Sequence, residues 1–488
     1  MRFKYILSAL NLILKDFSPV VLLPVIVAIY YHEYSMINPF LLAGLIAIAG
    51  SLFIRKFIKL TAEEENLNDI KRSEALMVVS LSWLVISCIA AVPYLFYGIS
   101  FENSLFEAVS GITTTGATIL TSYDIPKALM FWRSLTQWLG GMGIIVLFVA
   151  ILPQFAVAGR QMFFAESPGP TEDKFTPRIK NTASALWFIY AGLTVLCAVL
   201  LWLAGMPVYD AICNSFSTLS AGGFSPNSES ILGYHSNAIN WIIICFMFIA
   251  GTSFVLQSKV IKRKNLSLFW KSEEFRFYAI GILLISLVLA LVLFAQNDYS
   301  PFRAFTAAVY QTLALSTSTG SANEDFILWS FDAKIVLYFA MFLSSCSGSA
   351  GGGIKITRYI ILFKFLKNEL YKILHPKAVM SIKIDGKVVQ NDVIRQTIFF
   401  IVCFFGLCAI SSLILGYIEK DVNLALSCSL TAIGDIGPGL VDKVGPMQNF
   451  AHLQPLSKII MIFDMLVGRL EIIPFIVMFH KDFWKLKK

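Results

Sequence analysis

The sequence predicts an all-α polytopic membrane protein in which four pseudo-symmetric helix–pore-loop–helix repeats surround one pore, preceded by two N-terminal helices. Three observations support this fold class. Of the 488 residues, 57% are hydrophobic and 14% are charged, and the mean hydropathy is +0.72, whereas a soluble domain is normally about a quarter charged. Apolar stretches of roughly twenty residues recur along the chain, as a hydrocarbon core of about 30 Å requires. A polar segment containing glycine recurs four times between these stretches.

Ten apolar segments are candidates for membrane-spanning helices. Two short ones lie at residues 18–31 and 39–54. The other eight lie at residues 75–98, 130–152, 182–204, 237–257, 275–296, 333–346, 392–416 and 456–479. The first segment lacks a small-residue cleavage site, so we expect it to belong to the mature protein and not to a signal peptide.

These segments divide the chain into five units. We expect an N-terminal two-helix segment at residues 1–70. The four pore repeats follow at residues 71–158, 159–265, 266–380 and 381–488. No stretch long enough for a separate soluble domain is left over.

The 39 Lys and Arg residues are distributed unevenly between alternate loops. If the N-terminus is cytoplasmic, most of them fall on the cytoplasmic side, as the positive-inside rule requires. Both termini are then cytoplasmic, and topology explains basic stretches such as residues 259–264 and 355–395 without nucleic-acid binding. The outer loops carry net negative charge, which favours the attraction of cations.

The reactive side chains show no pattern typical of catalysis. Eight cysteines and five histidines are scattered without metal-ligand spacing, so we expect the cysteines to be buried, reduced thiols. An intramembrane enzyme would need a His, Asp or Glu dyad or a metal site at membrane depth, and the spans offer none. The sequence therefore predicts a protein that is not an enzyme.

A segment rich in Gly, Ser and Thr follows four alternate spans. The four segments lie at residues 104–120, 214–229, 310–325 and 427–440, and they align on Gly116, Gly223, Gly320 and Gly437. Each is predicted to be an amphipathic helix of about two turns that leads into a tripeptide and then the glycine. A small residue recurs in the next span, at Gly141, Gly251, Ser345 and Gly468. Ordinary turns between helices have no reason to repeat a glycine in register.

Membrane physics assigns these segments a role. Non-helical backbone at membrane depth is tolerated only where protein buries it or where it lines a water-filled path. Four such segments around one axis can point their carbonyls inward and replace the hydration shell of a cation. Glycine supplies the backbone freedom, Thr and Ser hydroxyls add uncharged oxygen ligands, and the helices aim their partially negative C-terminal ends at the axis.

These residues resemble the Trk/Ktr/HKT superfamily, most closely its bacterial TrkH/TrkG potassium uptake subunits, over almost the whole chain. The matching motifs are TTTGAT, STLSAGGFS, STSTGS, AIGDIGPG, SGSAGGGIKITR (347–358) and GRLEI (468–472). The resemblance implies ten membrane helices and four pore helices. It also implies a potassium filter formed by Thr113, Thr114, Thr115, Gly116, Ser220, Ala221, Gly222, Gly223, Thr317, Ser318, Thr319, Gly320, Gly434, Asp435, Ile436 and Gly437.

Two details of this filter bear on selectivity. Glycine at all four aligned positions resembles the potassium-selective members, because sodium-preferring relatives replace the first glycine by serine. Asp435 departs from the pattern, where a neutral residue such as Asn is expected. A carboxylate there either raises cation occupancy at an outer site or is neutralised by protonation.

The segment SGSAGGG (347–353) is expected to interrupt the third post-filter span, because each glycine destabilises a helix by about 1 kcal/mol relative to alanine. The resemblance implies a flexible intramembrane loop beneath the filter, with Gly348, Gly351, Gly352, Gly353 and Lys355 as candidate gate residues. A phosphate-binding loop fits poorly, because Ile354 separates Gly353 from Lys355 and no strand precedes the segment.

Arg469 is the second candidate gate. An arginine inside a membrane span is costly and normally faces protein or water. The resemblance implies that it faces the pore below the filter, as an electrostatic barrier and a donor to loop carbonyls. The alternative is an ion pair with Asp464 or Glu471, at spacings that are not ideal on one helix face. Only the third post-filter helix is expected to be broken.

The resemblance implies potassium uptake across the bacterial inner (plasma) membrane by a homodimer with one pore per protomer. A cytosolic TrkA-like nucleotide-binding partner would regulate it. Potassium is then the transported ion, and no organic cofactor is expected in this chain, which lacks a Rossmann fingerprint. The alternative is proton- or sodium-coupled potassium symport. That function needs titratable groups on the pathway, for which Asp435 and the surroundings of Arg469 are the candidates.

Overall fold

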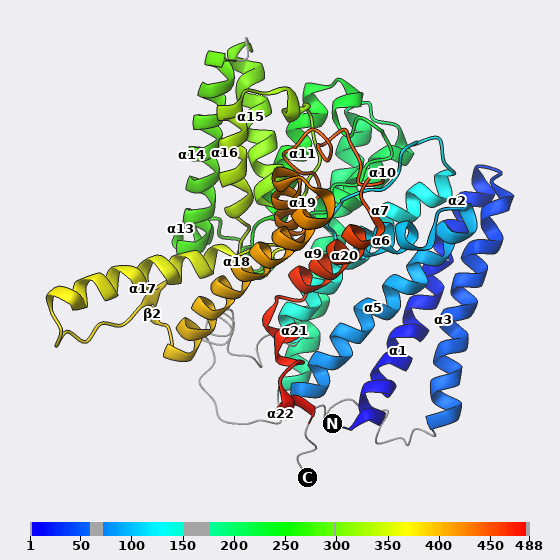
Figure 1. The fold of residues 1–488 in the computed structure, drawn as a ribbon, viewed down its shortest axis with the longest axis horizontal. Helices are drawn as coiled ribbons and strands as arrows, with labels where there is room; N and C mark the ends of the chain where they lie inside the picture. The colour runs from blue at the N-terminus through cyan, green and yellow to red at the C-terminus, as the bar shows by residue number, and fades with distance from the viewer. Residues whose placement is uncertain (1, 59–71, 151–174, 297–298, 485–488) are drawn as a thin grey trace.

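The computed structural model describes residues 2–58, 72–150, 175–296 and 299–484, and helices dominate it (Figure 1). The sheet in the described residues is one small antiparallel hairpin, β1 (Lys383–Ile384) and β2 (Lys387–Val388). The predicted all-α class is confirmed. The boundaries proposed at residues 70/71 and 158/159 lie outside the described residues, and the five-unit division stays a prediction.

The N-terminal segment forms a helical hairpin. Helices α1 (Phe3–Val21) and α2 (Leu23–Tyr30) form one span that packs against α3 (Ile37–Ile58). The span begins well before residue 18, where the sequence placed it. Polar residues in its first half are buried against neighbouring helices, and Ser51 donates to the Asn11 side chain at 2.6 Å.

Each of the four repeats consists of a long helix, a short helix and a further helix. The long helices are α5 (Arg72–Tyr97), α9 (Phe175–Leu203), α14 (Glu273–Gln296) and α18 (Asn391–Glu419). The short helices are α6 (Phe101–Ile112), α10 (Val208–Leu219), α15 (Pro301–Ser316) and α19 (Val422–Gly434). The helices that follow are α7 (Lys127–Ala150), α11 (Asn237–Ala250), α16 (Phe331–Phe342) and α20 (Pro455–Arg469).

The short helices are longer than the two turns expected, with 12, 12, 16 and 13 residues. They start earlier than the polar segments suggested, and two have side-chain caps. Ser300 accepts from the Arg303 backbone N–H, and Asp421 accepts from the Leu424 N–H. The backbone bond from Leu424 lowers the pKa of the Asp421 carboxyl, which keeps the cap ionised.

The repeats are arranged in a ring. The short helix α6 contacts α20 of the fourth repeat, α10 contacts α7 of the first, and α15 contacts α11 of the second. These three short helices are therefore held between their own repeat and the one before it, whereas α19 packs mainly on α18 and α20 of its own repeat. The N-terminal hairpin stands outside the ring against α5 and α7 (Figure 1).

Three of the four post-filter spans are broken, so the expectation of a single break is wrong. Helix α11 meets α12 (Phe254–Arg263) at 94°. Helix α16 gives way to a loop before α17 (Ile356–Leu374), and α20 stops before α21 (Ile473–Val477). Side chains satisfy the freed backbone at the first break, where Gln257 donates to the Ile249 carbonyl at 2.8 Å.

Six helical segments among the described residues are long and apolar enough to cross a membrane, and a seventh if α11 and α12 form one span. The shortfall from ten lies in the post-filter spans. Helices α16 and α20 have 12 and 15 residues, and α7 buries polar side chains such as Arg133 and Gln137. Short connecting helices are η1 (Tyr34–Met36), η5 (Leu232–Tyr234), α13 (Ser267–Lys271), η6 (Phe326–Leu328) and α22 (Lys481–Trp484).

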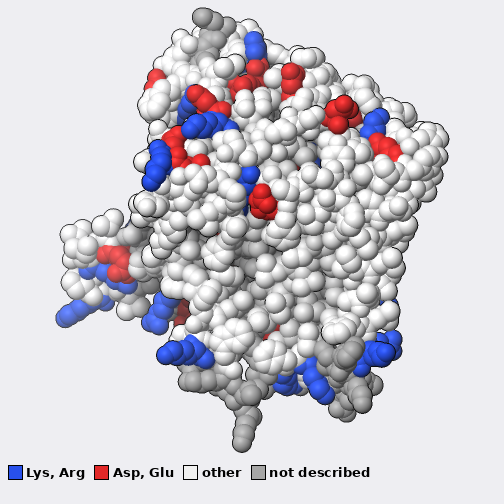
Figure 2. Space-filling view, turned by 45° about the vertical axis from the view of Figure 1, so that its right-hand side comes forward, with Lys and Arg blue, Asp and Glu red and all other residues white. Residues whose placement is uncertain are grey.

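The surface agrees with a membrane environment. Figure 2 shows charged residues gathered towards the two ends, with a broad, largely uncharged region between them. Large apolar side chains are exposed on the outer helices, for example Leu203 on α9 and Leu413 on α18. The chain is a multi-pass membrane protein. All eight cysteines are free; Cys88 and Cys245 are exposed, against the expectation that the thiols are buried.

Candidate functional site

The four aligned glycines share one backbone conformation. Gly116, Gly223, Gly320 and Gly437 have φ of 83°, 75°, 70° and 103°. The residue two positions before each glycine is also left-handed, at Thr114, Ala221, Ser318 and Asp435, with φ of 59°, 57°, 56° and 51°. This conformation is rare for a β-branched residue such as threonine. The four segments thus follow the same path despite their different side chains.

The glycines also close a ring. An ideal Cβ on Gly116 would lie 2.0 Å from the carbonyl oxygen of Gly222, in the second segment. An ideal Cβ on Gly223 would lie 1.9 Å from the Thr319 carbonyl oxygen. The corresponding distances are 2.2 Å from Gly320 to the Ile436 oxygen and 2.8 Å from Gly437 to the Thr115 oxygen, each measured from the ideal Cβ. Each oxygen belongs to the residue just before the neighbour's glycine. Segment one meets two, two meets three, three meets four and four meets one, with no room for a side chain.

The short helices orient the backbone of each segment. The residue before each glycine donates its N–H to a carbonyl in the last turn of its helix. The bonds are Thr115 to Ser110 at 2.9 Å, Gly222 to Ser217 at 2.8 Å, Thr319 to Ala314 at 2.8 Å and Ile436 to Thr431 at 2.9 Å. These bonds fix the backbone of each segment against its own helix. Two carbonyls of the ring also accept from side chains, Gly222 from Gln137 at 2.6 Å and Gly437 from Thr431 at 2.9 Å.

The threonine hydroxyls are mostly engaged within the protein. Thr113 donates to the Val109 carbonyl at 2.7 Å and contacts the Thr115 hydroxyl at 2.7 Å. Thr317 repeats this arrangement with Leu313 and Thr319, at 2.7 and 2.8 Å. Only some of the expected hydroxyl ligands are thus available, and the buried Thr114 hydroxyl is one that has no protein partner.

Two buried polar groups on α7, which the sequence analysis missed, position the first two segments. The Gln137 amide donates to the Gly222 carbonyl at 2.6 Å and accepts from the Phe224 N–H at 3.0 Å, so it holds both sides of Gly223. Arg133 pairs with Glu107 of α6 at 2.7 Å, and Glu107 accepts from the Ile119 N–H at 2.9 Å. Polar residues inside an apolar span were the available signal.

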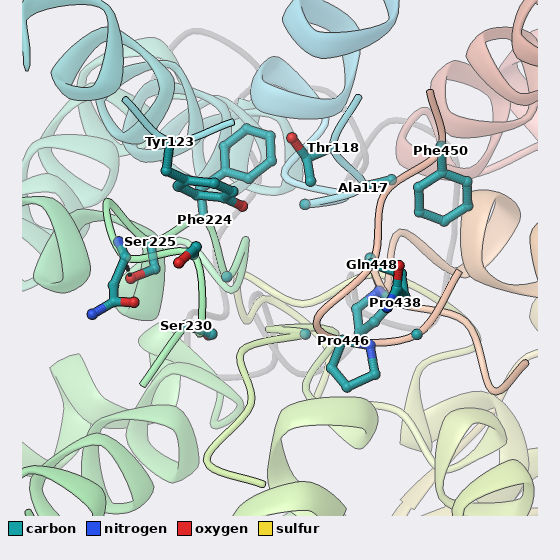
Figure 3. A pocket seen from close by; sticks show the side chains of 17 residues that line it. Ala117, Thr118, Tyr123, Phe224, Ser225, Ser230, Pro438, Pro446, Gln448 and Phe450 are labelled. Carbon is teal, nitrogen blue, oxygen red and sulfur yellow. Dashed lines mark hydrogen bonds between the residues drawn. The ribbon is translucent and has the colours of Figure 1, made fainter. Parts of the chain in front are cut away.

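One pocket lies on the side of the ring away from the loop at residues 343–355 (Figure 3). All four aligned glycines line it, and Tyr123, Phe224 and Phe450 stand around its opening. None of its lining residues is charged. The negative charge expected of the outer loops therefore does not extend to this mouth.

The opposite side of the ring is covered by the interrupted span. A Cβ on Gly351 would lie 2.6 Å from the Thr317 oxygen, and one on Gly352 would lie 2.5 Å from the Gly434 oxygen. The Gly352 N–H donates to the Ser318 hydroxyl at 2.6 Å, and its carbonyl accepts from Ser344. The loop thus lies directly against the first residues of segments three and four.

Two glycines turn the loop, and two buried cations hold it. Gly348 and Gly353 have positive φ, of 74° and 69°. Lys355 donates to the Gly351 carbonyl, and Arg469 donates to the Ala350 carbonyl at 3.0 Å. Both cations are at most 3% exposed.

Arg469 does not form the ion pairs that were its alternative. Asp464 accepts from Ser411, and Glu471 pairs with Arg358. The second bond of Arg469 goes to the Gly140 carbonyl at 3.3 Å. The hydrogen-bond partners of the Arg469 guanidinium are therefore backbone carbonyls.

Arg469 also replaces a glycine of the repeat. Gly468 lies against the Ile433 carbonyl as Gly140 lies against the Ile112 carbonyl, with Cβ distances of 2.2 and 1.9 Å. Gly468 therefore corresponds to Gly140, and the alignment with Gly141 is wrong by one residue. The equivalent glycine in each of these repeats is the one that lies against the end of the short helix of that repeat. Its distance along the sequence from the aligned glycine of the polar segment is not a reliable guide.

Glu274 is a further residue that the sequence analysis missed. It lies at the start of α14, is 3% exposed, and accepts from the Ser347 N–H and the Thr357 hydroxyl, both at 2.5 Å. Ser347 lies in the loop and Thr357 in the first turn of α17, so Glu274 joins the loop to the helix that follows it. A carboxylate at the edge of a predicted span gave no sign of this contact.

Comparison with known proteins agrees with this geometry. The family model TrkH, described as a cation transport protein, matches residues 45–486. The chain belongs to the TrkH family.

Relatives of the Trk system cover almost the whole chain. The Trk system potassium uptake protein TrkH of Salmonella typhimurium is 35% identical over 99% of this chain and 100% of its own length. TrkG of Escherichia coli is 32% identical over 95% of this chain and 94% of its own. The crystal structure of the potassium transporter TrkH from Vibrio parahaemolyticus has a TM-score of 0.90 and 33% identity, covering 99% of this chain and 100% of that one. These relatives are transporters.

Proposed function

We propose that this protein takes up potassium ions across the bacterial inner membrane through the ring of four segments. The observation that carries the proposal is the closure of that ring, in which each filter glycine faces the carbonyl of the next segment. Carbonyl oxygens around one axis replace the hydration shell of a potassium ion. The relatives named as potassium uptake proteins support potassium as the ion.

The filter in this proposal consists of the sixteen residues predicted from the sequence, four from each segment. Neutral backbone carbonyl oxygens around one axis favour a weakly hydrated monovalent ion over a strongly hydrated divalent one, and Asp435 is the one filter residue with an ionisable side chain. Potassium is the transported substrate. We expect no organic cofactor in this chain and no catalysis.

The gate in this proposal is the loop with Gly348, Gly351, Gly352, Gly353 and Lys355, together with Arg469. A cation leaving the filter inward would meet the loop backbone and then a buried guanidinium. Both oppose its passage, the first by occupying space and the second by charge repulsion in a region of low dielectric constant. In this proposal the loop closes that side of the filter and must move before an ion can pass.

The assembly in this proposal is a homodimer bound to a cytosolic TrkA-like regulator that carries the nucleotide site. Support comes from the name of the relatives, which are parts of a Trk system. The basic end of the molecule, where both termini lie, would face the cytosol and the regulator (Figures 1 and 2).

Proton- or sodium-coupled potassium symport is the second candidate function. It is favoured by one observation: Asp435 is fully buried beside the pathway, and its Oδ2 atom has no hydrogen-bond partner. A carboxylate so placed can take up a proton or a cation.

Flux from purified protein in liposomes tests the proposal. Potassium and rubidium should enter faster than sodium, at fixed membrane voltage, with and without a proton gradient. Gly223→Ala should abolish this selectivity because its Cβ would strike the Thr319 carbonyl. Gly406→Ala, at a helical position with open space, is the matched control. Equal entry of sodium and potassium would contradict the filter, and dependence on the proton gradient would favour symport.

A further inference from the structure

Asp435 lies on the inner side of the filter, which differs from the outer position considered from the sequence. It is the second residue of its segment, and it does not line the outer pocket, whereas Gly437 and Pro438 do. Its side chain faces the loop, because an ideal Cβ on Gly352 would lie 2.9 Å from the Asp435 Cβ and 3.2 Å from its Oδ2. The equivalent residues of the other segments, Thr114, Ala221 and Ser318, carry no charge.

The Asp435 carboxylate lacks a counter-charge in direct contact. It is 0% exposed; Oδ1 accepts from the Thr115 hydroxyl at 3.0 Å, and Oδ2 has no partner. The nearby cations bond elsewhere, Arg469 to two backbone carbonyls and Lys355 to Gly351 and Ser345. A buried carboxylate oxygen without a donor or a cation is costly.

Two oxygens converge on the space beside Gly352. The point that its Cβ would occupy lies 2.5 Å from the Gly434 carbonyl oxygen and 3.2 Å from Asp435 Oδ2. Carbonyl oxygens replace the hydration shell of an alkali cation, and a carboxylate oxygen is a charged, hard ligand that attracts cations. Because the loop glycine lies against both oxygens, a cation can bind them only when the loop moves away.

We propose that Asp435 Oδ2 and the Gly434 carbonyl form a monovalent-cation site at the inner end of the filter, and that seating of Gly352 competes with its occupancy. The inference rests on the proposed function, because cations must reach the site through the filter. Occupancy and loop displacement then favour each other, as reciprocal linkage requires. The hydrogen bond from the Gly352 N–H to the Ser318 hydroxyl breaks when the loop leaves.

Cytosolic block of rubidium current in planar bilayers tests the site, with barium as the probe because it is a divalent mimic of potassium. Asp435→Asn keeps the shape, the acceptor for Thr115 and the tolerance of a left-handed backbone, but removes the charge. We expect block by barium from the loop side to weaken about fivefold or more, with block from the opposite side unchanged. Gly352→Ala should strengthen block by barium from the loop side, because the loop no longer covers the site. When combined with Asp435→Asn, Gly352→Ala should not strengthen this block, because the site has lost its charge.

Two further variants keep the test decisive. If Asp435→Asn fails to insert into the membrane, Asp435→Ser replaces it in the test. This variant copies Ser318 of the third segment and should show the same weakened loop-side block. Asp464→Asn removes a buried carboxylate that Ser411 binds away from the loop, and should leave block unchanged. If Asp435→Asn conducts rubidium and its loop-side block is unchanged, the cation site is wrong. The cation site is also wrong if Asp435→Asn changes only the dependence of the current on the proton gradient, because Asp435 then binds a proton. Absence of rubidium current in the wild type would instead refute the proposed function.

Discussion

At the scale of single residues, the role of a buried arginine depends on the groups to which its guanidinium hydrogen-bonds. Arg469 and Arg133 are both buried arginines in post-filter helices. Arg133 has a carboxylate partner, Glu107, and braces the outer side of the filter. Arg469 bonds only to carbonyls, so its charge is not neutralised by a direct ion pair. The same residue type therefore stabilises structure in one place, whereas in the gate that we propose it opposes cation passage.

Arg469→Ala should raise potassium flux, because it removes both a positive charge beneath the filter and a bond to the loop. Lowering a barrier by ~1.4 kcal/mol increases a rate about tenfold, and we expect an increase of at least that order. Rubidium uptake into liposomes measures it. Arg469→Lys keeps the charge and should show a smaller increase. Unchanged or abolished flux in correctly inserted Arg469→Ala would count against a barrier role.

At the scale of elements, the loop between α16 and α17 fits against the filter because its contact residues there are glycines, which have no side chain. Gly351 and Gly352 lie against backbone carbonyls of segments three and four. Polar contacts from Ser318, Lys355, Glu274 and Arg469 hold the loop. The loop also buries Cys346, Ala350 and Ile354 among apolar neighbours, so leaving its seat costs apolar contacts as well as hydrogen bonds.

Gly352→Ala should raise basal flux, because the new methyl group would lie 2.5 Å from the Gly434 oxygen and keep the loop from seating. Its φ is not in the left-handed region, so alanine introduces no backbone strain there. Liposome uptake of rubidium without any regulator is the measurement. Gly406→Ala serves as the control, since nothing lies within 4 Å of that position. Flux equal to that of the wild type would show that the loop does not limit conduction.

At the scale of the whole molecule, the four repeats build a symmetric ring and an asymmetric lower half. The ring needs all four segments, because each glycine packs on the next. Below it, the repeats differ: a 94° bend in the second, the loop in the third, and Arg469 with a break in the fourth. Selectivity requires equivalence around the axis, whereas gating needs only one obstruction.

Both termini should be cytoplasmic, since they lie at the same, basic end of the molecule (Figures 1 and 2). Epitope tags at either end should resist protease in intact spheroplasts and be cleaved in inverted vesicles. A tag inserted at Lys443, in the exposed loop beside the outer mouth, should show the reverse pattern. A terminal tag cleaved in spheroplasts would invert the proposed orientation.

The sequence by itself determined the membrane class, the fourfold repeat and the place of the four aligned glycines, because these depend on local hydropathy and on a backbone conformation that favours glycine. It did not reveal the bend at Gly251, the correspondence of Gly468 with Gly140, or the roles of Gln137 and Glu274. Those depend on contacts between residues far apart in the chain. Asp435 shows the difference most clearly. Its presence was visible in the sequence, but only the packing of the loop against segment four decided that it faces inward, beside Gly352.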